Sequence, residues 1–103
     1  MDNLTLRQRI FTIVKEVPKG YIATYSQVAN LAGLPGYARL VGQTLSKLPR
    51  DTQLPWHRVI SAAGKISVLE DSESFLAQKK RLLNEGITFT KTRINLKEYQ
   101  WQP

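Results

Sequence analysis

The chain has 103 residues, which is enough for one domain with a single modest core. Apolar residues make up 42% and charged residues 22%, which excludes a disordered tail, and no apolar run approaches the roughly 20 residues of a membrane span. The absence of cysteine excludes disulfides and thiolate metal sites, and the net charge of +7 favours nucleic-acid binding, although membranes and acidic proteins attract basic surfaces too.

The first part of the chain predicts two helices in succession. Apolar residues recur at helical spacing over residues 6–17, and the Pro-Lys-Gly sequence at 18–20 ends that helix. Thr24 and Gln27 have the spacing of a capping box and begin a second helix, which stops at Gly33.

A third helix is predicted from about residue 36 to residue 48, where Pro49 closes it. Two short helices joined by a short turn with glycine are typical of a helix-turn-helix, here over about 25–48. An ordinary helical hairpin has the same spacing. The polar face of the third helix and the basic charge make the two interpretations about equal.

The second half predicts short strands around one longer helix. The expected elements are a strand at 59–60, a turn at 62–65, a returning segment at 66–69, a helix over 72–84, a strand at 87–90 and a final element from about 94. The apolar face of the longer helix would consist of Phe75, Leu76, Leu82 and Leu83. Tyr99 and Trp101 are expected to pack onto the body, which gives one mixed, mainly helical domain over 1–103 with short strands.

The basic excess lies mainly in the N-terminal half, because residues 1–50 hold seven Lys and Arg against two acids, and residues 51–103 hold eight against six. The first four residues lack a basic region followed by an apolar run, so we expect no signal peptide and a cytoplasmic protein, nucleoid-associated if bacterial. One histidine without cysteine cannot assemble a zinc site, and no cofactor is expected.

The most informative motif is the hexapeptide P-W-H-R-V-I at residues 55–60. It resembles the P-C-H-R-V-[IV] signature of O6-alkylguanine-DNA alkyltransferases. Three further motifs of that family occur in the same order: the segment 21–29 with its tyrosine, the recognition-helix sequence A-R-L-V-G at 38–42, and L-L-N-E-G-I at 82–87. The resemblance covers nearly all of the chain and implies a winged-helix-like domain with a helix-turn-helix. The family's variable N-terminal domain is expected to be absent.

Three departures from the family pattern matter. Trp56 replaces the alkyl-acceptor cysteine, and an indole has no thiolate to accept an alkyl group. The chain is therefore similar to the alkyltransferase-like proteins, which keep the lesion-reading site without the reaction. Leu48 replaces an asparagine that ties the recognition helix to the active-site turn. The segment 67–72 replaces a Gly- and Tyr-rich loop, so one wall of the pocket differs.

The resemblance assigns DNA contacts to the helix-turn-helix. Tyr25 would rotate the phosphate of the target nucleotide, and Arg39 would enter the duplex through the minor groove and replace the flipped base. Without the resemblance, half-buried packing and a solvated charge are the ordinary roles of such residues. The remaining DNA-binding residues on the same helix are Ala38, Gly42, Gln43 and Thr44, of which Ala38, Gly42 and Thr44 are small enough for close approach.

The resemblance also implies a lesion pocket. Trp56 would pack against the alkylated base, although a tryptophan after proline in an apolar run is usually part of a core. His57 and Glu85 match the family's base and its carboxylate, and without a nucleophile they become structural. Arg58 would link the turn to the recognition helix. The pocket is expected to consist of Tyr25, Pro55, Trp56, Val59, Val68 and Leu69.

The resulting hypothesis is a monomeric, non-enzymatic protein that binds O6-alkylguanine in double-stranded DNA, flips it, and flags it for nucleotide excision repair proteins. No membrane partner is expected. The alternatives are a sequence-specific helix-turn-helix transcription regulator, which would prefer an undamaged sequence, and an active transferase, against which the missing cysteine argues.

Overall fold

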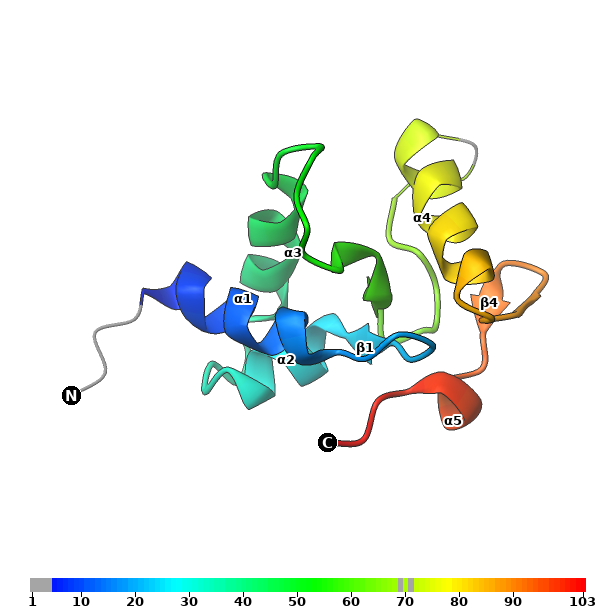
Figure 1. Ribbon diagram of the computed structural model, residues 1–103. Coiled ribbons are helices and arrows are strands. Elements are labelled where there is room, and N and C mark those ends of the chain that lie inside the picture. Colours follow the sequence, from blue (N-terminus) through cyan, green and yellow to red (C-terminus); the bar gives the residue numbers. More distant parts are fainter. Residues whose placement is uncertain (1–4, 69, 71) are drawn as a thin grey trace.

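The computed structural model describes residues 5–68, 70 and 72–103. The N-terminal helices gather on one side of the molecule, and the longest helix with the C-terminal elements lies on the other (Figure 1). In chain order the elements are α1 (Leu6–Glu16), β1 (Ala23–Thr24), α2 (Tyr25–Leu31), α3 (Ala38–Ser46), the 3-10 helix η1 (Trp56–Arg58), β2 (Val59–Ile60), α4 (Glu73–Asn84), β3 (Phe89–Thr90), β4 (Arg93–Ile94) and α5 (Leu96–Tyr99).

This architecture confirms the predicted fold class of a mainly helical domain with short strands. None of the described helices is both long and apolar enough to cross a bilayer.

The start of α2 is fixed by the capping box that the sequence predicts. The Gln27 amide donates to Thr24 Oγ1 at 3.1 Å, and the Thr24 amide donates to Gln27 Oε1 at 3.4 Å. Gln27 Nε2 also donates to the Trp101 carbonyl at 2.7 Å, and Gln100 Nε2 donates to Gln27 Oε1 at 2.8 Å. The C-terminal segment therefore holds the N-terminus of α2 in place.

Helix α3 is shorter than the predicted range of 36–48. Gly36 has a φ of +86°, which is outside the helical region, so the helix begins only at Ala38. At the other end, the amides of Lys47 and Leu48 bond the carbonyls three residues earlier, which tightens the last turn before the chain leaves the helix. Helices α2 and α3 pack against each other as a helix-turn-helix requires.

A parallel pair of strands separates two apolar clusters. Ala23 of β1 is paired with Val59 of β2, and both face the helix-turn-helix cluster, which consists of Ile10, Val14, Val17, Ala23, Val28, Ala29, Ala32, Leu34, Val41 and Val59. Successive strand residues point to opposite faces. The α4 cluster on the other side consists of Ile22, Ile60, Ile66, Phe75, Leu82, Ile87 and Ile94.

The turn predicted at 62–65 is confirmed, and the described part of the returning segment, residues 66–68, forms no strand. Strand β2 pairs with β1, and Ser67 and Val68 form a bend. The Ser61 amide donates a hydrogen bond to the Lys65 carbonyl at 3.0 Å and closes the turn. The Ile94 amide donates to the Gly64 carbonyl at 2.8 Å and ties the turn to β4. Leu69 lies outside the described residues.

The predicted apolar face of α4 is wrong in part. Phe75 and Leu82 are buried, but Leu76 and Leu83 are 53% and 49% exposed. Gln78 is buried in their place because its amide donates to two backbone carbonyls of the η1–β2 segment. The buried face of α4 is therefore determined in part by the hydrogen bonds of Gln78, which the spacing of apolar residues does not reveal.

The C-terminal elements pack onto the body as expected. Strands β3 and β4 form an antiparallel hairpin, so the strand predicted at 87–90 is confirmed at its second half. The Trp101 amide donates to the Ile22 carbonyl at 2.7 Å, and the Ile22 amide donates to the Tyr99 carbonyl at 2.9 Å. Tyr99 packs against the α4 cluster and Trp101 against the helix-turn-helix cluster.

Gly64→Ala should destabilise the fold more than Gly36→Ala. Both glycines have positive φ, at +78° and +86°, and a left-handed alanine costs about 1–2 kcal/mol. At Gly64 a Cβ would also lie 2.6 Å from the Ile94 carbonyl oxygen, whereas at Gly36 nothing lies within 4 Å. Urea denaturation should show a loss of about 1 kcal/mol at Gly36 and of more than about 2 kcal/mol at Gly64. Equal losses would contradict the proposed close approach of the turn to β4.

Candidate nucleic-acid interface and pocket

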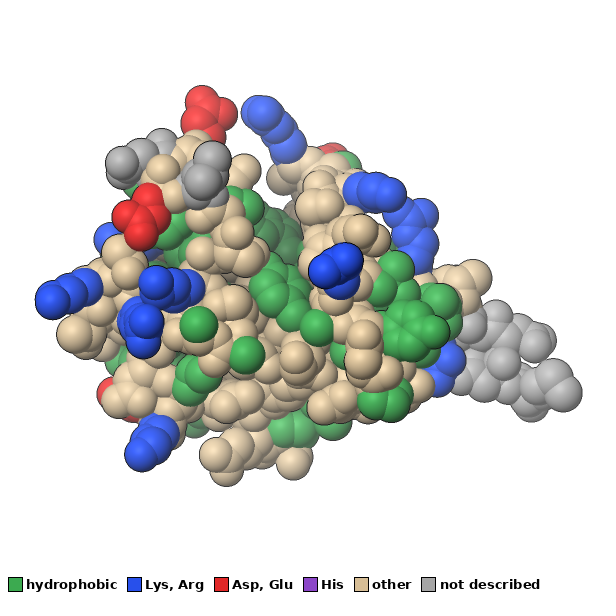
Figure 2. Space-filling model, turned by 180° about the vertical axis from the view of Figure 1, so that it is seen from behind, with side chains coloured by type: hydrophobic (Ala, Val, Ile, Leu, Met, Phe, Trp, Pro, Cys, Tyr) green, Lys and Arg blue, Asp and Glu red, His purple; other side chains and the backbone are tan. Residues whose placement is uncertain are grey.

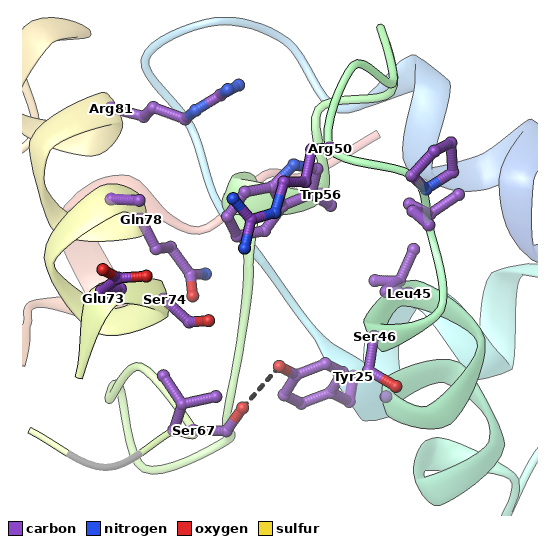
Figure 3. A pocket seen from close by; sticks show the side chains of 15 residues that line it. Tyr25, Leu45, Ser46, Arg50, Trp56, Ser67, Glu73, Ser74, Gln78 and Arg81 are labelled. Atoms are coloured by element: carbon purple, nitrogen blue, oxygen red, sulfur yellow. Dashed lines mark hydrogen bonds between the residues drawn. The ribbon is translucent and has the colours of Figure 1, made fainter.

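A pocket of about 650 Å³ opens between α3 and α4. One wall comes from the helix-turn-helix, the opposite wall from α4, and η1 lies between them (Figure 3). The space-filling view shows a hollow with a mainly hydrophobic lining and Lys and Arg side chains projecting on both sides of it (Figure 2). A concave apolar site with a basic rim suits an uncharged ring attached to a polyanion.

Tyr25 is the first residue of α2 and lines the pocket, half-buried. Its hydroxyl lies 2.7 Å from Ser67 Oγ, as Figure 3 shows, so the side chain connects the helix-turn-helix with the segment after β2. The ring lies against Gly42 of α3, where an added Cβ would sit 3.8 Å from Tyr25 Cε1. The capping box at Thr24 thus places a hydroxyl at the pocket edge.

Trp56 opens η1 and lies in the same pocket, half-buried rather than in the core. Its ring meets the His57 ring edge to face, with the centroids 6.1 Å apart. The Trp56 amide donates to the Leu54 carbonyl at 2.8 Å, and the Leu54 amide donates to Thr52 Oγ1 at 3.2 Å. These short-range bonds shape the segment that leads from α3 to η1, and Leu48 contributes its side chain to the pocket lining.

The segment after Trp56 is held by one carboxylate. Glu85 Oε2 lies 2.8 Å from His57 Nε2 and 2.7 Å from Arg58 Nη2, and Arg58 Nε donates to Glu85 Oε1 at 2.9 Å. Arg58 Nη1 donates to the Val17 carbonyl at 2.8 Å. Arg58 is therefore a structural link, but it connects η1 to the ends of α1 and α4, and the prediction that it reaches the recognition helix is wrong.

Electrostatics keep this network in one ionisation state. Burial raises the pKa of Glu85, but hydrogen bonds from Arg58 and then His57 outweigh it and lower the pKa from 4.5 to about 2. Burial lowers the pKa of His57 below its usual range, and the hydrogen bond to Glu85 only partly opposes it. His57 is thus neutral at pH 7, with its proton on Nε2 facing the carboxylate.

The second ring nitrogen of His57 accepts nothing from the described residues, because Nδ1 is buried without a hydrogen-bond partner among them. The backbone around it is anchored by Gln78 Nε2, which donates to the His57 carbonyl at 3.0 Å and to the Val59 carbonyl at 3.1 Å. His57 and Glu85 therefore hold this turn in place, and the chain has no cysteine for them to activate.

The predicted DNA-binding residues of α3 divide into two groups. Arg39 and Gln43 are exposed, and Ala38 and Gly42 are half-buried. Thr44 is only 4% exposed and packs inward, so its side chain does not belong to the surface group in which the sequence analysis placed it. Its position on α3, three residues after the buried Val41, puts it on the core side of the helix.

Only some of the residues predicted to form the pocket wall line the pocket. Val68 lines the pocket, but Val59 is 1% exposed and belongs to the helix-turn-helix cluster, because β2 pairing turns it away from the pocket. Pro55 is half-buried and precedes η1 without lining the pocket. Leu69 lies outside the described residues, so its place in the wall stays a prediction.

Sequence reasoning missed the α4 wall. Its lining residues on that helix are Glu73, Ser74, Ala77, Gln78 and Arg81. The signal was present, because small and polar residues at 74, 77, 78 and 81 recur at i, i+3, i+4 and i+7, the spacing of a single helical face. Arg50, which follows α3, also lines the pocket and was not singled out.

The fold is that of a methyltransferase DNA-binding domain. The family model described as "6-O-methylguanine DNA methyltransferase, DNA binding domain" matches residues 5–87. The DNA base-flipping protein of Vibrio parahaemolyticus is 44% identical over 96 residues, covering 92% of this chain and 94% of its own. Alkyltransferase-like protein 1 of Schizosaccharomyces pombe is 40% identical over 100 residues, covering 92% and 93%.

Solved structures agree with the sequence comparison. S. pombe Atl1 in complex with damaged DNA containing O6-carboxymethylguanine has a TM-score of 0.89 at 39% identity, covering 95% of each chain. Mycobacterium tuberculosis OGT in complex with DNA has a TM-score of 0.70 at 28% identity, covering 82% of this chain and 51% of that one. The chain therefore belongs to the alkyltransferase DNA-binding-domain family, among its alkyltransferase-like, base-flipping members.

Glu85→Gln should remove a large part of the acid sensitivity of the fold. A pKa lowered from 4.5 to about 2 stabilises the folded state fully above about pH 4.5, and this contribution, about 3 kcal/mol, is lost as the pH falls toward 2. The variant should be less stable than the parent at pH 7 by about that amount, with a smaller difference near pH 3. Urea denaturation between pH 7 and pH 3 measures both.

Glu16→Gln is the matched control, because Glu16 is exposed at the end of α1 and forms no ion pair with the residues that the structure describes. Its stability should follow the parent curve. If Glu85→Gln and Glu16→Gln had the same pH profile, Glu85 would not hold the turn.

Proposed function

We propose that the protein binds double-stranded DNA that contains O6-alkylguanine, turns the modified nucleotide out of the helix into the pocket at Trp56, and holds it there without transferring the alkyl group. The observation that carries this proposal is the half-buried indole in the pocket, at the position where the family signature has its cysteine. An aromatic wall supplies stacking and apolar contact to a flipped base, worth roughly 1–3 kcal/mol.

The absence of a reaction follows from the residues at the site. The chain has no cysteine, and an indole cannot become an anionic nucleophile at neutral pH. His57 and Glu85 are in contact as the family's base and carboxylate would be, but without a cysteine they have no thiol to activate. Within the described ranges no group of three or more His, Asp or Glu side chains could hold a metal ion. These observations support a binding function without alkyl transfer.

The helix-turn-helix supports the DNA contact. Arg39 and Gln43 are exposed on α3, and Tyr25 lies where α2 meets the pocket. In the proposed complex α3 enters the minor groove, Arg39 replaces the extruded base, and the Tyr25 ring and hydroxyl act on the target phosphate. The net charge of +7 makes this binding salt-dependent.

The lesion is best described as an O6-alkyl group of variable size. The Atl1 complex contains O6-carboxymethylguanine, so a relative with this fold holds an adduct larger than methyl. A protein that cannot remove the adduct can only shield or advertise it. We therefore assign the bound complex a role as a flag for nucleotide excision repair proteins, with a monomer as the binding unit.

The protein should bind a duplex that carries one modified base more tightly than the unmodified duplex. Fluorescence anisotropy near physiological salt would compare a duplex that carries one O6-methylguanine with the same duplex that carries guanine. Flipping costs less at a badly paired base, so the modified duplex should bind more tightly. Arg39→Ala should weaken lesion binding by about tenfold, and Tyr25→Phe should weaken it by a smaller factor.

Arg93→Ala is the matched control, since Arg93 is an exposed arginine of β4, away from α3 (Figure 1). It should lose little more than the nonspecific charge contribution. Equal binding of the modified and unmodified duplexes would refute the lesion-sensor proposal and favour a helix-turn-helix regulator, which prefers an undamaged sequence.

The protein should keep its mass when it meets the lesion. Intact-mass spectrometry after prolonged incubation with O6-methylguanine DNA should show the unmodified chain, because no thiolate is present. A mass increase of one methyl group would overturn the non-enzymatic assignment and identify another acceptor residue.

A further inference from the structure

Two cations in the pocket have no part in the function proposed above. Arg50 follows α3 and Arg81 comes from the last turn of α4, and both line the pocket beside Trp56 (Figure 3). The Arg81 guanidinium carbon lies 5.5 Å from the centroid of the Trp56 ring, within cation–π range. The aromatic wall is therefore paired with a positive group.

This positive charge is not neutralised by the carboxylates that the structure describes. The ion pairs among the described residues both involve Glu85, and neither includes Arg50 or Arg81. Glu73 also lines the pocket, but it stands eight residues before Arg81 on the same helix, which corresponds to about 12 Å along the axis. The pocket thus holds two arginines that belong to neither ion pair among the described residues.

The charge of Arg81 also reaches His57, the residue directly after Trp56. Besides burial, repulsion from Arg58 and from Arg81 contributes to the lowered pKa of His57. A group that enters beside Trp56 would meet the same field. An anion there is stabilised by a planar guanidinium with several donors, whereas a neutral group of equal size gains only packing.

Arg81 could bind one of two anionic groups of a bound, flipped nucleotide. In the proposed complex the flipped base lies against the Trp56 ring. Its O6 substituent is then close to the Arg81 guanidinium, which lies over the same ring. We propose that Arg81 makes the pocket selective for O6 adducts that end in a carboxylate over neutral adducts of the same shape; this rests on the flipping function proposed above. The other source of the same chemistry is a phosphate of the flipped nucleotide, which every lesion shares.

The test compares two isosteric lesions in one duplex sequence: O6-carboxymethylguanine, which carries a carboxylate, and O6-carbamoylmethylguanine, its neutral amide. O6-methylguanine and guanine complete the set. Anisotropy near physiological salt should show carboxymethyl binding about fivefold to tenfold tighter than carbamoylmethyl, the range of a charge-assisted hydrogen bond weakened by partial exposure.

Arg81→Gln should reduce the carboxymethyl-to-carbamoylmethyl affinity ratio to about one. Lys80→Gln is the matched control, because Lys80 is an exposed neighbour on α4 that does not line the pocket and its loss removes the same charge. It should preserve the ratio. Thermal unfolding checks that both variants fold.

The outcomes separate the sources of the anion. If Arg81→Gln weakens all lesions by the same factor, Arg81 binds a phosphate and the proposal is overturned. An unchanged ratio in Arg81→Gln, or no preference between the isosteres in the parent protein, also overturns it. Failure of the flipping function has a different signature: O6-methylguanine and guanine would bind equally, whatever residue stands at position 81.

Discussion

The structure depends on one carboxylate that joins three separate parts of the chain. Glu85, directly after α4, bonds His57 and Arg58 of η1, and Arg58 in turn bonds the carbonyl of Val17 after α1. Because the partners of Glu85 are a neutral imidazole and a guanidinium, the carboxylate remains ionised although it is largely buried. The position of Trp56 at the start of η1 is a direct consequence, since both residues that follow it are held.

The same network suits a binding site better than a reaction site. A turn fixed on three sides gives Trp56 little freedom, and a fixed aromatic wall binds a flat ring with small entropic cost. The parallel β1–β2 pair completes the support, because it places one apolar cluster under the helix-turn-helix and another under α4. The pocket is the space that remains between these two supported walls.

Local rules predicted local features well. The capping box of Thr24 and Gln27 depends on residues three apart, and the structure has it. The α4 face depends on tertiary contacts, so apolar periodicity favoured Leu76 where a hydrogen bond buries Gln78. The partners of Arg58 are 41 and 27 residues away, and nothing in its neighbourhood indicates them. Motif order supplied the family and the pocket residue at 56, but not the wall that α4 contributes.

The bonds between Gln27 and the C-terminal segment have a consequence for how the chain is made. Gln27 takes part in the capping box of the helix that begins with Tyr25. Its side-chain nitrogen Nε2 also donates to the carbonyl of Trp101, 74 residues further along the chain. During synthesis the helix-turn-helix leaves the ribosome before the residues that hold the first turn of α2, because those residues lie more than 70 positions further along the chain. A nascent chain can therefore assemble α1 to α3 locally, but it acquires a firmly held Tyr25 only after Gln100 and Trp101 have also left the ribosome.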